Sequence, residues 1–326
     1  MLQQFRTQFG QRYMPACLIV RHESPPRSRE AHTLRSFRNI CAISTIVRAY
    51  EGGEWQPRFS DHFDIYPLAA AQSGWIVTND AIVRDLNPSP RFSGQSSPLI
   101  QTPSNFTCQP SQRLFARLRN AWQACYFRRR QRRELLRLFR SVEIALHASR
   151  FPTDSLLSVH DAGLRLVLWV SAFEILLHPG GGRIRLPAVL AFLRNLQWND
   201  QRLAHRRYSL QYAGTPPRVS LPEAIYYDLY MARNDFAHGN EVPVNRLWFR
   251  SNRRLAQLRR QAPVLYWKVL DHRLNSLFPA QNIQPPPHAP VQWDLTPQGR
   301  RYIQQQAAEW ADMRGVEQAL LRRARL

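Results

Sequence analysis

Three side chains capable of acid–base or phosphate chemistry lie close together at Arg233, Asn234 and His238. An imidazole exchanges protons near neutral pH, and a guanidinium presents a planar fork of donors to a phosphate. An amide can hold either group in place. Together they could stabilise charge and move protons while the 2′-OH of RNA attacks its own phosphodiester, a reaction that requires no metal.

The residues around this motif predict a helix that ends just after it. Pro222 suits the first turn of that helix, and Gly239 suits the position after its last residue. Asn234 and His238 are four residues apart, so they share a side of the helix, and Arg233 lies between that side and the core. The apolar residues that recur at helical spacing and predict the core-facing stripe are Leu221, Ile225, Leu229, Ala232 and Phe236.

Spacing alone does not distinguish this motif, because arginine is abundant in the chain. Arg27 precedes His32 and Arg140 precedes His147 at similar separations. Only the motif at residues 233–239 combines an asparagine after the arginine, a helix end and a terminal glycine. We therefore interpret it as the candidate catalytic site.

The sequence RNDFAHG at residues 233–239 resembles the Arg-polar-x-x-x-His signature of HEPN domains, especially the Apea-like group. The apolar stretch at 166–177 resembles a helix of that group, and residues 92–98 resemble a segment often found upstream. The resemblance covers residues 110–275 well and 60–105 loosely. It implies an antiparallel helical bundle.

The same resemblance implies a homodimeric, metal-independent endoribonuclease that uses no cofactor. His238 would transfer protons, Arg233 would stabilise the phosphorane, and Asn234 would orient the site. Bacterial defence or a toxin-like stress response is the implied setting, with an antitoxin or regulatory protein as a further partner. Some HEPN proteins are not nucleases, so the alternative is a non-catalytic RNA-binding or regulatory protein.

Glu174 lies within residues 160–177, the most apolar predicted helix, which we place at the centre of the bundle. A buried carboxylate needs a partner, and Arg233 is the partner we expect. The pair would fix the guanidinium, so Glu174 is a supporting site residue. The alternatives are a purely structural ion pair or a carboxylate that faces water.

The formal net charge of +22 predicts salt-sensitive attraction to polyanions, with RNA as the expected partner. Lys268 is the only lysine, so a general bias toward arginine is the competing explanation. The densest block is the expected RNA-binding element, unless it is simply a solvated helix face. Tyr126 and Phe127 precede it and could stack bases, although we expect at least one of them in the core. The arginines of the block are Arg128, Arg129, Arg130, Arg132 and Arg133.

We expect a mainly α fold in three parts. Residues 1–105 form a small mixed α/β region, with strands at 40–47, 63–66 and 75–78 and a short helix at 79–86. Residues 106–278 form the helical domain, with helices at 113–150 (broken near the arginine block), 160–177, 186–196, 222–238 and 255–274. A loop with His205 spans 198–220. Residues 279–326 form a proline-rich spacer and a C-terminal helix.

Cysteine spacing and hydropathy favour a cytoplasmic protein. Cys17, Cys41, Cys108 and Cys125 are far apart and show no zinc-ligand spacing, as expected of reduced thiols. No apolar run reaches the roughly 18 residues that a membrane span needs. The N-terminus superficially resembles a transit peptide, which we attribute to the basic composition.

Overall fold

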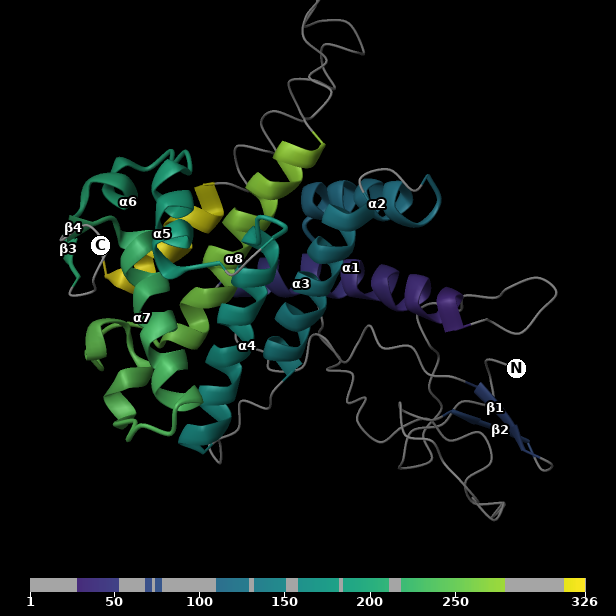
Figure 1. The fold of residues 1–326 in the computed structure, drawn as a ribbon, viewed down its shortest axis with the longest axis horizontal. Helices are drawn as coiled ribbons and strands as arrows, with labels where there is room; N and C mark the ends of the chain where they lie inside the picture. Colours follow the sequence, from purple (N-terminus) through teal and green to yellow (C-terminus); the bar gives the residue numbers. More distant parts are fainter. Residues whose placement is uncertain are drawn as a thin grey trace, which may run out of the picture.

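The computed structural model is mainly helical (Figure 1), as the sequence predicts. It describes residues 28–52, 68–71, 74–77, 110–128, 132–150, 158–181, 184–210, 218–278 and 314–325. The longer helices are α1 (Ser28–Gly52), α2 (Gln112–Tyr126), α3 (Arg132–Arg150), α4 (Val159–Leu177), α5 (Leu186–Asn195), α7 (Leu221–Ala237) and α8 (Leu258–Leu277).

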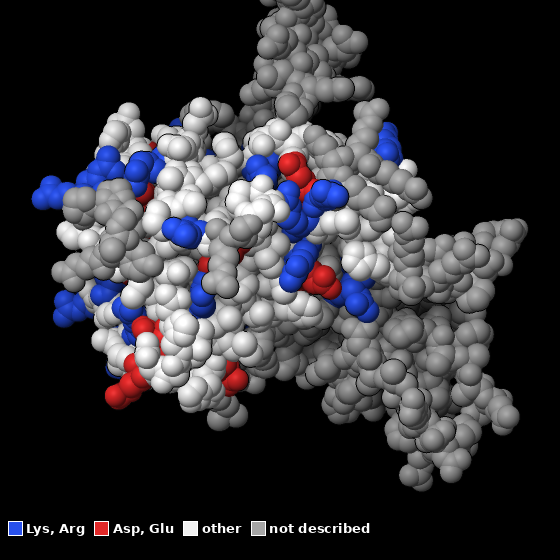
Figure 2. All heavy atoms as spheres, viewed as in Figure 1, with Lys and Arg blue, Asp and Glu red and all other residues white. Residues whose placement is uncertain are grey.

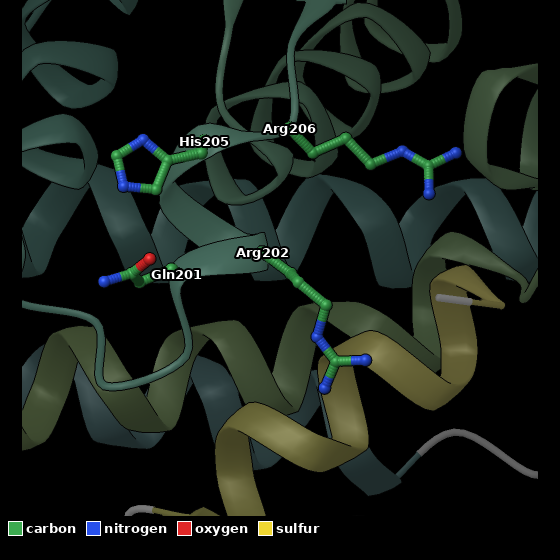
Figure 3. Close-up of a pocket in the computed structure, with 4 residues that line it drawn as sticks. All are labelled: Gln201, Arg202, His205 and Arg206. Atoms are coloured by element: carbon green, nitrogen blue, oxygen red, sulfur yellow. The ribbon is translucent and has the colours of Figure 1, made fainter.

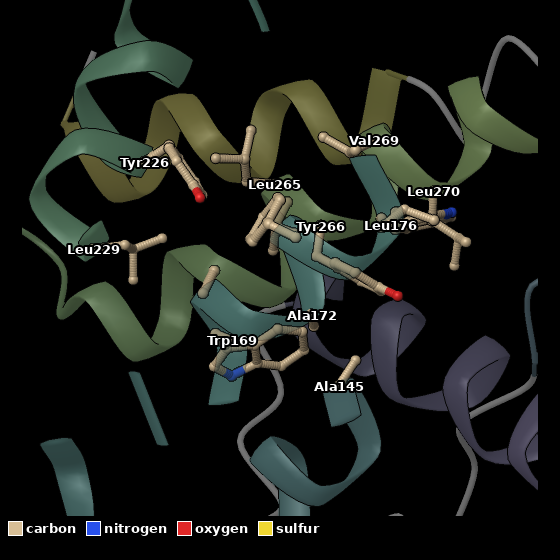
Figure 4. Packing of buried hydrophobic residues seen from close by; sticks show 14 of the residues in the cluster. Ala145, Trp169, Ala172, Leu176, Tyr226, Leu229, Leu265, Tyr266, Val269 and Leu270 are labelled. Carbon is tan, nitrogen blue, oxygen red and sulfur yellow. The ribbon is translucent and has the colours of Figure 1, made fainter. Parts of the chain in front are cut away.

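Helix α4 lies at the centre and packs against α3, α7 and α8. Its sequence is apolar on almost every side, so each neighbour finds an apolar face to cover. Trp169 and Phe173 are fully buried and stack against Tyr266 of α8, with ring centroids 5.6 Å and 5.4 Å away. Figure 4 shows this cluster together with Tyr226 and Leu229 of α7. The predicted central position of this helix is confirmed.

The expected strand at residues 40–47 is wrong, because this segment lies inside α1. Ile40, Ile43 and Ile46 are buried, and α1 packs against α2, α3 and α8. Short apolar runs fit a buried strand and a buried helix equally well, so periodicity could not separate them. The hydroxyl of Ser44 donates to the carbonyl of Ile40 at 2.9 Å, as serine does inside helices. The helical core therefore extends N-terminal of the boundary we expected near residue 105.

Helix α7 begins with a capping box. The Ser220 backbone and hydroxyl donate to Glu223 at 2.8 Å and 2.7 Å, which satisfies donors at the helix start. Glu223 is fully buried and also accepts two bonds from Arg194 of α5, at 3.1 Å and 2.8 Å. This network fixes the start of the helix that carries the candidate site.

The segment 198–220, expected to be a loop, contains regular structure. Helix α6 (Gln201–His205) is followed by β3 (Tyr208–Ser209) and β4 (Arg218–Val219), which pair antiparallel. The polar composition hid them because they bury few side chains: Leu203, Leu210 and Val219. Near the N-terminus, β1 (Leu68–Ala71) pairs with β2 (Gly74–Val77), which overlaps the strand expected at 75–78. The elements expected at 63–66 and 79–86 lie outside the described residues.

The break that we expected within residues 113–150 is confirmed between α2 and α3. Two 3₁₀ turns, η4 (Val244–Leu247) and η5 (Phe249–Ser251), connect α7 to α8. Residues 314–324 are helical, and the buried Glu317 joins them to the bundle. Its carboxylate accepts from Lys268 of α8 at 2.9 Å and from the backbone of Asp200 at 2.8 Å. The expected spacer at 279–313 lies outside the described residues.

Candidate functional site at the end of helix α7

The structure places Arg233, Asn234 and His238 on the last turns of α7. Arg233 and Asn234 are half-buried, whereas His238 is the exposed C-cap residue. The His238 amide donates to the Asn234 carbonyl at 3.0 Å, and the Asn240 amide donates to the Asp235 carbonyl at 3.0 Å. Gly239 has φ +70, a left-handed conformation that glycine adopts without strain. The helix therefore ends where the sequence predicts.

Arg233 forms the predicted ion pair with Glu174 of α4. The side chains are 21% and 26% exposed, so the pair is partly shielded but open to solvent on one side. The guanidinium also lies over the Tyr230 ring, 4.7 Å from its centroid. These two contacts hold the guanidinium against the bundle. Burial raises the pKa of Glu174, and the positive charge of Arg233 offsets part of that rise.

A buried tyrosine lies below this pair and was missed by sequence reasoning. Tyr226 is fully buried, and its hydroxyl has no hydrogen-bond partner within the described structure. Burial raises its pKa far above the ordinary value, and the negative charge of Glu174 adds to that rise. Tyr226 and Tyr230 are four residues apart, and Arg233 follows three residues later. That spacing could have predicted a tyrosine-lined arginine.

Close packing between α4 and α7 sets the position of the helix end. A Cβ atom built on Gly163 of α4 would lie 2.3 Å from the ring of Phe236. Only glycine therefore allows the ring to approach so closely. Phe236 is the last residue of the predicted apolar stripe, and it is half-buried here. The contact fixes the turn of α7 that carries Asn234 and precedes His238.

Two arginine–aspartate pairs hold the segment after α7 against that helix. Arg246 donates to Asp235 at 2.8 Å, and the Arg250 backbone amide donates to Asp228 at 2.6 Å. Arg250 adopts φ 53, a rarely populated conformation outside glycine, within this anchored segment. The sequence contained the charges but no regular spacing that would have paired them.

One chain does not bring the three motif side chains into mutual contact. No hydrogen bond joins the side chains of Arg233, Asn234 and His238 within the described residues. The guanidinium turns toward α4, while the imidazole is exposed at the helix end. A phosphate bound here could meet both groups only at the solvent-facing edge of the helix terminus.

The arginine block lies on a different part of the fold, at the break between α2 and α3. Arg128 and Arg133 are exposed, while the side chains of Arg129, Arg130 and Arg132 lie outside the described structure. Phe127 is 65% exposed. Tyr126 packs inward, with its hydroxyl 2.7 Å from that of Ser36, so one aromatic residue belongs to the packed interior as expected.

Comparisons of the chain with protein-family models, curated proteins and solved structures found no match. Within the described residues, no helix is long and apolar enough to cross a membrane. The same residues contain no group of three or more His, Cys, Asp or Glu side chains placed to hold a metal ion. Cys41 and Cys125 are free thiols.

Proposed function

We propose that this protein is a metal-independent endoribonuclease whose reaction centre is formed by Arg233, Asn234 and His238. The observation that supports this most directly is the ion pair between Arg233 and Glu174. It holds a guanidinium at the helix end where His238 is exposed. A fixed cation beside a free imidazole is the minimum equipment for phosphodiester transesterification.

In this proposal the RNA 2′-OH attacks the adjacent phosphorus and the 5′-oxygen of the next nucleotide leaves. His238 accepts the proton of the 2′-OH or supplies one to the leaving oxygen, and Arg233 stabilises the charge on the phosphorane. The products are a 2′,3′-cyclic phosphate and a free 5′-hydroxyl. Asn234 orients the phosphate, and Glu174 positions Arg233.

The proposal includes a homodimer. One chain supplies one imidazole at this helix end, whereas the reaction needs a base and an acid. Two copies related by a two-fold axis would place two motifs opposite each other and supply both. Because His238 is exposed, a partner could approach it without unfolding the helix. The biological setting in defence or stress response, with an antitoxin or regulator, belongs to the same proposal.

The test is cleavage of RNA by purified protein in EDTA, with the product ends identified. We expect wild type to leave 2′,3′-cyclic phosphates, and Arg233→Ala and His238→Ala to lose at least about 100-fold in rate. The matched controls are Arg140→Ala and His147→Ala, an arginine and histidine of similar spacing on α3. Undiminished cleavage by folded His238→Ala would refute the proposal.

A second candidate function is RNA binding or regulation without catalysis. The observation that favours it is the engagement of Arg233 by both Glu174 and Tyr230, as in a structural ion pair. It predicts salt-sensitive RNA binding by wild type and by His238→Ala alike, with intact RNA recovered from both. The same preparations therefore decide between the two functions.

A further inference from the structure

A second basic surface lies on α6 and the β3–β4 hairpin, a region without any motif in the sequence. We define the hairpin surface as Arg206, Arg207, Tyr208, Arg218 and Arg250. Arg218 pairs across the hairpin with Ser209, and both are exposed, while Tyr208 pairs with the buried Val219. Figure 2 shows Lys and Arg side chains gathered at the left edge, where α6 and the hairpin lie in Figure 1.

The positive charge of this surface is largely uncompensated. Asp200 is engaged by Arg202, at 2.7 Å, and Asp228 is engaged by Arg250, at 3.5 Å. Within the described residues, no ion pair involves Arg206, Arg207 or Arg218. The residues that connect β3 to β4, at 211–217, contain no charged side chain. A surface of this kind attracts phosphates strongly.

An aromatic ring lies among these charges. The Arg206 guanidinium lies 5.8 Å from the centroid of the Tyr208 ring, and Tyr208 is half-exposed. Next to it is an open hollow of about 570 Å³, lined in the described structure by Gln201, Arg202, His205 and Arg206 (Figure 3). Phosphate donors beside an accessible ring suit single-stranded nucleic acid, because only unpaired bases can stack on a side chain.

The hairpin surface is joined physically to the helix that carries His238. Arg250 donates to the Ser209 carbonyl at 3.1 Å and also pairs with Asp228 of α7. From Asp228 to His238 the helix rises about 15 Å. Along that stretch Arg246 binds Asp235. The chain therefore presents a run of basic residues from the hairpin to the candidate reaction centre.

We propose that the hairpin surface binds the backbone of single-stranded RNA and leads it toward His238. Phosphates would contact Arg207 and Arg218, and a base would stack beside Arg206 on Tyr208. This inference rests on the proposed function for its substrate, but RNA binding at this surface does not require cleavage. It differs from the expectation for the arginine block, because α6 contacts α7 directly while α2 packs on α1, α3 and α8.

The experiment measures fluorescence anisotropy of a labelled 20-nucleotide uridine RNA with the full chain carrying His238→Ala, in EDTA. Adding Arg206→Gln, Arg207→Gln and Arg218→Gln should weaken binding about tenfold or more near physiological salt. The slope of log affinity against log salt should fall by about 2, the value expected from three lost phosphate contacts on a single strand. The substituted side chains are exposed, so circular dichroism and Tm should not change.

The control removes the same charge elsewhere, with Arg119→Gln, Arg140→Gln and Arg185→Gln, all exposed. It should bind RNA like the parent. Equal affinity and slope for the hairpin variant and its parent would overturn the inference, as would absence of RNA binding by the parent. Equally tight binding of a duplex would overturn the single-strand assignment. Loss of binding in the hairpin variant, together with a wild type that never cleaves, would support the surface and refute the nuclease.

Discussion

The Arg233–Glu174 pair combines two effects at the scale of single residues. Half-burial makes each charge costly to leave alone, so each holds the other. The same burial favours the neutral form of the carboxyl and raises the pKa of Glu174. A guanidinium held this way has a defined position but a partner that can be protonated. Both the nuclease and the purely structural interpretation contain this pair, and they differ in what its loss does to cleavage.

The raised pKa of Glu174 predicts a pH-dependent stability difference between wild type and Glu174→Gln. An acid whose pKa is higher in the folded chain stabilises folding below its unfolded value of 4.5. That contribution is lost as pH rises through the folded pKa. Relative to Glu174→Gln, the wild-type free energy of unfolding should therefore fall with rising pH. One proton limits the slope to about 1.4 kcal/mol per pH unit. Urea unfolding from pH 3 to 7 measures it.

Asp161→Asn is the matched control because the pKa of Asp161 shifts the other way. Hydrogen bonds from Ser158 lower it below 3.8. Its contribution is therefore present above pH 3.8 and is lost as pH falls below that value. Parallel stability profiles for wild type and Glu174→Gln would contradict the prediction for Glu174.

At the scale of elements, local patterns predicted α4 and α7 because each is long, periodic and capped. Helix α1 was misread because its buried stretch at 40–47 is short, apolar and β-branched, which also suits a strand. The hairpin at 208–219 was missed because its strands have two residues each and bury little. In the site, Arg233 and Glu174 were paired correctly by burial arguments. Tyr226 was not found, because an unpartnered hydroxyl depends on packing that the sequence does not show.

The contact between Gly163 and Phe236 predicts how an element controls the site. Gly163→Ala would place a Cβ atom 2.3 Å from the Phe236 ring, so the ring or the end of α7 must move. We expect a loss of about 1–3 kcal/mol in the free energy of unfolding. If the proposed nuclease is correct, cleavage should fall as well, because Phe236 lies between Asn234 and His238. Urea denaturation and the EDTA cleavage assay measure the two effects.

Gly181→Ala is the control for this substitution. A Cβ atom on Gly181 meets nothing within 4 Å, so both stability and cleavage should stay near wild type. A Gly163→Ala protein as stable as Gly181→Ala would show that α7 can shift at no cost. In that case the close packing would not position the site.

At the scale of the whole molecule, the C-terminal helix at 314–324 joins parts of the chain that are distant in sequence. Glu317 accepts from the Asn199 and Asp200 backbone amides, at 3.1 Å and 2.8 Å, and from Lys268 of α8. Asp200 in turn caps α6. The sequence predicted a helix here, but its docking site could not be read because the partners lie more than 45 residues away. The docked helix supports the hollow and the hairpin surface from below α6.

Removing the Glu317 carboxylate should therefore affect both stability and the hairpin surface. Glu317→Ala leaves the Lys268 ammonium, which is 8% exposed, without its counter-charge and leaves two backbone amides without their acceptor. Losing one partner of a buried pair costs about 3–5 kcal/mol. The neighbouring exposed Gln318→Ala should cost under about 0.5 kcal/mol. Thermal unfolding compares the two, and a Tm for Glu317→Ala equal to that of Gln318→Ala would show that the helix docks without this network. If the Tm of Glu317→Ala falls and its RNA affinity falls with it below the melting range, α6 needs the C-terminal helix to keep its arginines in place. Unchanged affinity in a destabilised variant would instead show that the hairpin folds independently of that helix.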